Sequence, residues 1–212
     1  MKNKEHINHI VEIKAMMEKS TRFLSLSGLS GVAAGTIALI GAAIAFFALD
    51  YHHRYMDINA YLSEGMYCQW RQNLPLLIAD GIGVLVLAIG SAMFFTIRKA
   101  KKDGNRLWNP AAKRLLINLF IPLATGGIIF MIMLYHGLVY LVAPFTLIFY
   151  GLALINASKF TLDEIRTLGI SEIVLGLLAS FLVGYGLLFW AVGFGLLHIF
   201  YGIYMYRKHE IK

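Results

Sequence analysis

The stretch RKAKKDGNRLWNPAAKR, residues Arg98 to Arg114, decides the fold of this chain. It contains seven Lys or Arg residues and one acid, Asp103. Apolar segments lie on both sides of it, and each reaches the roughly 20 residues that a helix needs to cross a bilayer. Lys and Arg residues beside membrane-crossing helices stay on the cytoplasmic side. The stretch is therefore predicted to be a cytoplasmic loop that orients the whole chain.

The composition is that of a membrane protein. Hydrophobic residues make up 58% of the 212 residues, and the mean hydropathy is +0.67. In a soluble protein the net charge of +7 would suggest nucleic-acid binding. Cytoplasmic retention of Lys and Arg explains the same excess, so we expect no nucleic-acid partner. The single cysteine, Cys68, excludes a disulfide framework and a Cys-rich metal site, and we expect no cofactor.

The hydropathy pattern predicts an all-α polytopic integral membrane protein, a bundle of six transmembrane helices with both termini cytoplasmic. A cytoplasmic amphipathic helix is predicted over residues 1–25, because Ile7, Ile10, Ile13 and Met17 share a helical face. The alternative interpretation is a solvent-exposed segment that simply precedes the first span. A single transmembrane domain follows over residues 26–206, and residues 207–212 are a cytoplasmic tail. The predicted spans are residues 26–49, 74–97, 115–134, 138–155, 170–189 and 191–206.

The number of spans depends on the last apolar block, residues 170–206. As one helix it would extend ~55 Å, whereas the hydrocarbon core is ~30 Å thick. We therefore expect two spans with a turn at Phe189–Gly193. With six spans, seventeen of the nineteen Lys and Arg residues lie on one side, and Arg54 and Arg71 lie on the other. This separation favours a bacterial-type inner membrane with the basic side in the cytoplasm.

Three local signals predict helix ends and a turn. Asp103-Gly104 is typical of a turn within the basic loop. Asn109-Pro110 is predicted to be the N-cap and first residue of the third long helix. The pattern Thr161-x-x-Glu164 predicts a capping box at the start of the fifth.

Small residues predict two faces of close helix packing. Gly31 and Gly35 form a GxxxG pattern in the first span. Gly195, His198 and Gly202 have i, i+3, i+7 spacing, so they share one face of the last span. Such faces pack within a molecule or join two copies of a chain, so a homo-oligomer stays open.

Asp80 is a candidate functional residue, because it lies six residues inside the predicted second span. A carboxylate facing lipid at mid-helix costs about 2.5–3.5 kcal/mol, so Asp80 needs a partner or a wet cavity. One reading is an acid that couples ion or proton movement. The other is an acid near the interface that is hydrated or paired with Arg54 or Arg71.

His198 is the second intramembrane candidate. If the last span begins at Trp190, Asp80 and His198 have similar depths and could form a proton-relaying pair. The alternative is a neutral histidine bonded to a carbonyl or hydroxyl. Glu172 and Asn118 lie near the predicted cytoplasmic ends of spans and are interpreted as helix-end polar residues that reach water.

A weak candidate metal site is predicted on the external side, where imidazole and carboxylate ligands gather. Its residues are His52, His53, Asp57 and His136. No established zinc motif connects them. A solvated, hydrogen-bonded loop is the favoured alternative.

Two functional classes remain. The favoured one is a non-enzymatic binding or regulatory component, because Asp80 is the only acid predicted to lie well inside the bilayer. Its partners would be a cytosolic protein or anionic lipid at the cytoplasmic face. The residues assigned to this contact are Lys99, Lys101, Lys102 and Arg106. The alternative is a small-solute or ion transporter or channel with Asp80 and His198 at its coupling site.

Overall fold

The computed structural model describes residues 22–48, 64–105, 107–182 and 184–211, and their side chains except those of residues 64–72. Most of these residues are helical, and none of them lies in a strand. The predicted all-helical class is confirmed. The elements are α2 (Gly28–Ala48), α5 (Glu64–Lys102), α6 (Pro110–Tyr135), η1 (Val139–Leu141), α7 (Val142–Ser158), α8 (Glu164–Phe181), α9 (Gly186–Trp190), the π-helix η2 (Ala191–Leu197) and α10 (His198–His209).

Several of these helices can cross a membrane. In the described residues, five segments are long and apolar enough: Gly28–Ala48, Asn73–Lys102, Pro110–Tyr135, Val139–Ser158 and Gly186–His209. The remaining long helix, α8, has 18 residues and carries Glu164, Arg166 and Glu172. This set of apolar helices is typical of a helical membrane protein.

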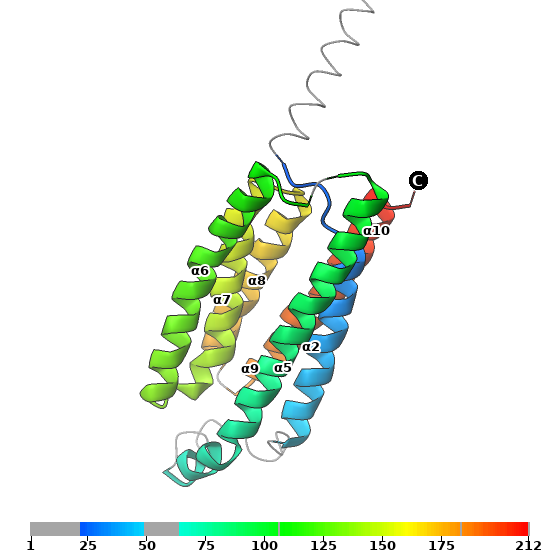
Figure 1. The fold of residues 1–212 in the computed structure, drawn as a ribbon. Coiled ribbons are helices and arrows are strands. Elements are labelled where there is room, and N and C mark those ends of the chain that lie inside the picture. The colour runs from blue at the N-terminus through cyan, green and yellow to red at the C-terminus, as the bar shows by residue number, and fades with distance from the viewer. Residues whose placement is uncertain (1–21, 49–63, 106, 183, 212) are drawn as a thin grey trace, which may run out of the picture.

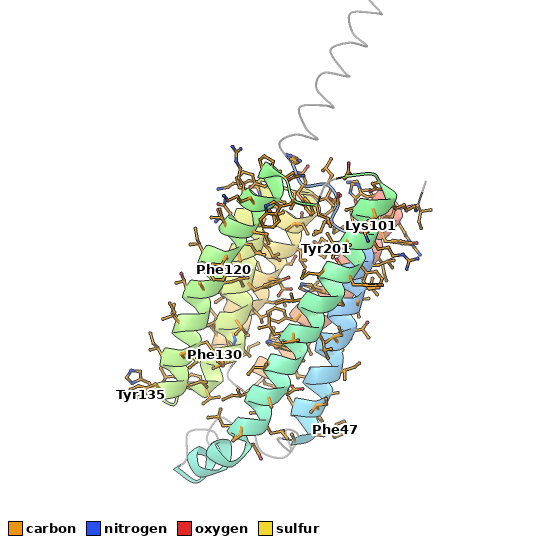
Figure 2. The ribbon with its side chains drawn as sticks, in the orientation of Figure 1. Phe47, Lys101, Phe120, Phe130, Tyr135 and Tyr201 are labelled. Atoms are coloured by element: carbon orange, nitrogen blue, oxygen red, sulfur yellow. The ribbon has the colours of Figure 1, made fainter. Side chains whose placement is uncertain are left out.

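The helices form two three-helix units (Figure 1). In the first unit α2 contacts both α5 and α10, and in the second α7 contacts both α6 and α8. The short α9 and the π-helix η2 contact helices of both units. No residue is buried in the most apolar stretch of α5 or of α6. These two helices are therefore the outer edges, as Figure 2 shows for Phe120 of α6.

The glycines singled out in the sequence meet where α2 packs on α10. A Cβ atom added to Gly31 would lie 3.1 Å from the Cα of Gly202, and one added to Gly35 would lie 2.6 Å from the carbonyl oxygen of Gly195. Only residues without a side chain let two backbones approach so closely. This glycine face is used inside the molecule, between α2 and the helical segment that ends in α10.

Residues 22–27, here called the strap, run across one end of the bundle and bind the second unit. The backbone N–H of Phe23 donates to the carbonyl of Phe160 at 2.7 Å, and the hydroxyl of Thr161 donates to the carbonyl of Phe23 at 2.8 Å. Phe23 is buried against Ala111 and Ala112 of α6. The strap therefore contacts the start of α6 and the turn between α7 and α8.

The strap also leads into the first unit, where polar side chains form hydrogen bonds with the end of the strap and the first residue of α2. Glu210 accepts hydrogen bonds from the backbone N–H of Gly28 at 2.6 Å and from the hydroxyl of Ser27 at 3.1 Å. The first N–H groups of a helix have no partner within it, so this carboxylate, which follows the last residue of α10, caps the start of α2. Lys99 donates to the carbonyl of Leu26 at 2.8 Å.

The predicted local signals have different outcomes. Asn109 is the N-cap of α6 and accepts from the N–H of Ala112 at 2.7 Å, with Pro110 as the first helical residue. The turn at Asp103-Gly104 is also present, with Gly104 at φ +65°. Both predictions are confirmed.

Two other predictions are wrong. The capping box fails because α8 begins at Glu164, whose carboxylate binds Lys208 while the Thr161 hydroxyl binds the strap. The turn predicted at Phe189–Gly193 lies instead between α8 and α9, where Gly184 has φ +97°. Trp190 is therefore inside a helical segment that runs from Gly186 to His209.

Candidate functional site

Three polar side chains from different helices meet inside the bundle. Glu172 comes from the middle of α8, His198 is the first residue of α10, and Tyr150 lies in α7. Glu172 is 0% exposed and His198 is 7% exposed. Polar groups buried this deeply need partners within the protein, and their contacts define what the site can do.

Both ring nitrogens of His198 are engaged. Nδ1 lies 3.0 Å from the carbonyl oxygen of Gly193, and Nε2 lies 2.8 Å from the hydroxyl of Tyr150. A carbonyl only accepts hydrogen bonds, so in the neutral imidazole Nδ1 carries the hydrogen. Nε2 then accepts the hydrogen bond that Tyr150 donates. These contacts select one tautomer and fix the orientation of the ring.

The carboxyl group of Glu172 is next to this histidine but forms no hydrogen bond with the residues that the structure describes. Its Oε1 lies 3.4 Å from Nδ1 of His198, an ion-pair distance, yet the Nδ1 hydrogen points to the carbonyl of Gly193. Neither carboxyl oxygen has a hydrogen-bond partner among the described residues. A buried carboxylate without such bonds is costly, and it is relieved by binding a proton, a cation or water.

A glycine makes room for the carboxyl group. A Cβ atom added to Gly193 would lie 2.5 Å from Oε2 of Glu172 and 2.5 Å from Cδ2 of Leu147, a fully buried residue of α7. Gly193 is part of the π-helix η2. Single π-turns that interrupt α-helices frequently lie at functional sites. Here the π-turn contains Gly193, and His198 follows it directly, so that both residues lie against Glu172.

Aromatic rings cover the histidine. Phe194 stacks on His198, with centroids 6.0 Å apart and an interplanar angle of 19°. Tyr150 and Trp190 each lie 4.9 Å from the ring of Phe194. This group of rings, together with Leu147, surrounds the pair with apolar surface. The surrounding medium has a low dielectric constant, which strengthens electrostatic interactions within the pair.

The arrangement is suited to holding and passing a proton. A carboxyl group and an imidazole 3.4 Å apart can share a proton after a small side-chain movement, and Tyr150 extends the chain of groups by one hydroxyl. A metal site is a different matter. Among the residues that the structure describes, no group of three or more His, Cys, Asp or Glu residues could hold a metal ion.

The structure does not bring Asp80 and His198 together. α5 contacts α2, and the carboxyl of Asp80 faces Gly41, where an added Cβ atom would lie 3.5 Å from both of its oxygens. His198 instead binds residues of α7 and η2. The predicted partners of Asp80 were Arg54 and Arg71, whose side chains lie outside the described residues.

Sequence reasoning missed the acid of the site. Glu172 was interpreted as a helix-end residue in contact with water, and this is wrong because it is completely buried. A signal was present: Gly169, Glu172 and Gly176 have the same i, i+3, i+7 spacing as Gly195, His198 and Gly202. The spacing places each ionisable residue on a close-packing face. No comparable signal marks Tyr150.

The remaining predicted residues are dispersed. Lys99 is 8% exposed and donates a hydrogen bond to Leu26 of the strap, so its assignment to a lipid or partner contact is wrong. Lys101 and Lys102 are exposed, and Arg106 lies outside the described residues. The candidate metal ligands His52, His53 and Asp57 also lie outside them, and His136 is exposed at the end of α6 beside Tyr135.

Comparison with known proteins adds no relative. No family model, curated protein or solved structure matches the chain.

Proposed function

We propose that the protein is a small membrane transporter in which Glu172 and His198 take up and release the protons that it carries across the membrane. The observation that carries this proposal is the state of Glu172, which is fully buried, lies 3.4 Å from His198 and has no hydrogen bond within the described residues. An acid retained under these conditions is costly to the fold. Ionisable residues inside membrane domains typically mark ion or proton pathways.

The position of the pair supports transport over a regulatory role. The sequence alone favours a regulatory component, because it places only Asp80 well inside the bilayer. Glu172 and His198 add a second acid and a base in contact with each other, at a π-turn that contacts both units. Transporters commonly place their binding sites at the junction of two units and beside interrupted helices.

The proposal includes a topology of six spans in a bacterial-type inner membrane, with both termini cytoplasmic. Its support is the distribution of charge. The strap, the end of α5, the turn before α8 and the end of α10 meet at one end of the bundle (Figure 1). The described basic residues gathered there include Lys101, Lys102, Lys159, Arg207 and Lys208. This end corresponds to the cytoplasmic side.

Proton flux into liposomes tests the function. Purified protein is reconstituted into vesicles that contain a pH-sensitive dye, and a potassium diffusion potential drives protons inward. We expect wild-type protein to acidify the lumen and Glu172→Gln to abolish this flux. Asp80→Asn is the matched acid-to-amide control and keeps it. Absence of flux in wild-type protein, or unchanged flux in Glu172→Gln, would overturn the proposal.

A second candidate function is binding of anionic lipid or a cytosolic partner through the basic loop. The observation that favours it is exposure: Lys101, Lys102, Lys113 and Arg114 are exposed, and Trp108 is 73% exposed. Basic side chains beside an aromatic residue are typical of contact with an anionic membrane surface. A wild-type protein without proton flux that co-purifies with a stable partner would favour this function.

A further inference from the structure

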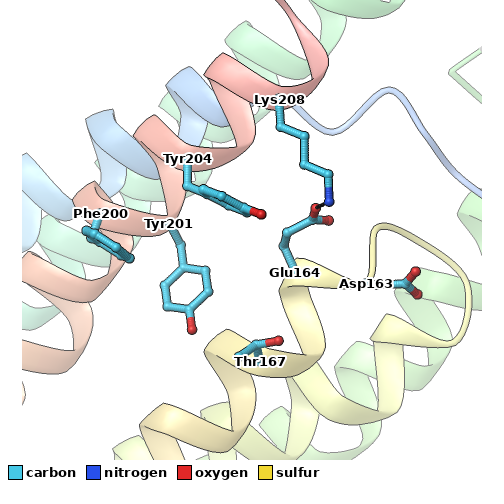
Figure 3. Close-up of a pocket in the computed structure, with 7 residues that line it drawn as sticks. All are labelled: Asp163, Glu164, Thr167, Phe200, Tyr201, Tyr204 and Lys208. Carbon is cyan, nitrogen blue, oxygen red and sulfur yellow. Dashed lines mark hydrogen bonds and ion pairs between the residues drawn. The ribbon is translucent and has the colours of Figure 1, made fainter.

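A hollow of about 400 Å³ lies between α8 and α10 near the basic end of the bundle (Figure 3). Its volume falls within the range of small-molecule sites, roughly 300–1,000 Å³. Its lining residues are Asp163, Glu164, Thr167, Phe200, Tyr201, Tyr204 and Lys208. Glu172 and His198 lie on the same two helices, and Glu164 precedes Glu172 by about 12 Å of helix. The hollow is therefore placed where a solute could approach the buried pair.

One wall of the hollow binds a cation that the chain itself supplies. The ammonium group of Lys208 donates to Oε1 of Glu164 at 2.6 Å and lies 5.7 Å from the centroid of the Tyr204 ring. The carboxylate of Glu164 is 8% exposed, whereas the Lys208 side chain is 52% exposed. A shielded carboxylate and an aromatic face are the two groups that recognise organic cations.

Lys208 is a replaceable occupant. Because half of its side chain is exposed, it can turn into solvent at little cost once another cation takes its place. Asp163 does not compete for this role, since its carboxylate pairs with Arg22 at 3.0 Å and is 81% exposed, so that solvent screens its charge. Glu164 is therefore the acidic group that a ligand would meet.

The other wall is aromatic. Phe200, Tyr201 and Tyr204 follow helical spacing along α10 and line the hollow beside Lys208. Phe200 is 66% exposed and Tyr204 is 48% exposed, so their rings are available for stacking. Flat apolar groups stack on such rings, whereas a small inorganic cation would leave them uncovered.

We propose that the hollow binds a monovalent organic cation with a flat aromatic body, which displaces the Lys208 ammonium from Glu164 and Tyr204. The binding of such a cation is inferred from the geometry of the hollow alone. Naming this cation as the transported solute deepens the proposed function and rests on it.

Ethidium, a fluorescent flat monocation, is the probe. Its binding to purified protein in detergent is followed by fluorescence anisotropy, with no gradient and no vesicles. We expect Glu164→Gln to weaken binding about tenfold, because a charge-assisted contact is lost. We expect Lys208→Met to tighten binding severalfold, because the internal competitor is removed. Asp103→Asn and Lys159→Met are matched controls at exposed positions outside the hollow and leave affinity within about twofold.

If Glu164→Gln fails to fold, the expected increase in the ethidium affinity of Lys208→Met still decides the test. Absence of ethidium binding by wild-type protein, equal binding by Lys208→Met and wild type, or weaker binding by Lys208→Met would overturn the inference. Glu172→Gln separates it from the proposed function. If that variant binds ethidium normally and the wild type shows no proton flux, the transport proposal fails and the binding site stands.

Discussion

Glu172 is buried in the core although no described residue forms a hydrogen bond with its carboxyl group. Its burial follows from its neighbours on α8. A Cβ atom added to Gly169 would lie 2.7 Å from the carbonyl oxygen of Gly151, and one added to Gly176 would lie 2.8 Å from that of Pro144. The close approach of α8 to α7 at both glycines encloses Glu172 between them. The acid is thus buried by packing on either side of it.

Tyr150 is expected to stabilise the fold through His198. In Tyr150→Phe, Nε2 of His198 loses the hydroxyl that donates to it at 2.8 Å. A buried acceptor left without a partner costs about 1–3 kcal/mol, so the free energy of unfolding should fall by that amount. Thermal unfolding in detergent measures the change.

Tyr201→Phe is the matched control, because Tyr201 is a partly buried tyrosine one turn beyond His198. Its hydroxyl has no hydrogen bond with the described residues, so its removal should change stability little. Equal effects of the two substitutions would contradict the role given to the Tyr150 hydroxyl.

Glu164 makes the stability of the basic end depend on pH. Burial alone raises the pKa of Glu164, but hydrogen bonds from Lys208 and His209 outweigh it and hold the pKa below its ordinary range. A group whose pKa is lower in the folded state stabilises the fold above its unfolded pKa, about 4.3. This stabilisation is lost as the pH falls through the folded pKa.

We therefore expect wild-type protein to be more stable than Glu164→Gln at pH 7. The difference in melting temperature should narrow progressively below about pH 4.3. Melting curves of both proteins between pH 7 and pH 3 measure it. A difference that stays constant over this range would show that the charge of Glu164 contributes nothing.

At the scale of elements, the contact between α2 and α10 depends on having no side chains between the backbones. A Cβ atom added to Gly202 would lie 2.6 Å from the backbone nitrogen of Val32 and 2.7 Å from the carbonyl oxygen of Gly28. Backbone atoms on both sides cannot move as a flexible side chain can. The two helices would have to separate to accept even one methyl group.

Gly202→Ala is accordingly expected to lower the free energy of unfolding by about 1–3 kcal/mol through overpacking. Gly90→Ala, on the open face of α5, is the matched control, since an added Cβ atom there meets nothing within 4 Å. Because alanine favours helix over glycine, this control should be neutral or stabilising by up to about 1 kcal/mol. Thermal unfolding of the two variants in detergent compares them. Equal destabilisation would show that close packing is not the cause.

At the scale of the molecule, the two units are joined at one end by the strap and deeper in the bundle by α9 and η2. Figure 2 shows Lys101 at the end that holds the strap, and Phe47 and Tyr135 at the opposite end. The strap closes the basic end through backbone and hydroxyl hydrogen bonds, which are individually modest and can be exchanged for water. The buried pair, Glu172 and His198, lies between the strap and the end of the bundle that holds Phe47 and Tyr135.

The orientation of the whole molecule is tested by a reporter fused after the last residue. We expect alkaline phosphatase, which is active only in the periplasm, to be inactive at this position, and a cytoplasmically fluorescent protein to be bright. The same reporters fused after Gly137 should give the opposite pattern, because the α6–η1 turn lies at the other end of the bundle. An active phosphatase at the C-terminus would contradict the six-span topology.

The residues whose structural roles are predicted correctly from the sequence are those marked by a local motif or by a periodic spacing. Asn109 and Pro110 begin a helix because the cap and the fixed φ of proline act within one turn. Gly31 and Gly202 have the spacing of close-packing faces, and the structure has these faces in contact. Lys99, by contrast, belongs to a run of basic residues that resembles a solvated loop. Its burial depends on Glu210 and Leu26, which are distant in sequence.

The sequence by itself determined that the chain is a bundle of apolar helices, because the length of each apolar run and the clustering of Lys and Arg are properties of single segments. Only the tertiary structure decided that His198 meets Glu172 and Tyr150 and that Asp80 faces Gly41. The physical reason is that depth along a helix can be counted from residue numbers. Which helices are neighbours, and which face each turns inward, depends on how all of them pack together.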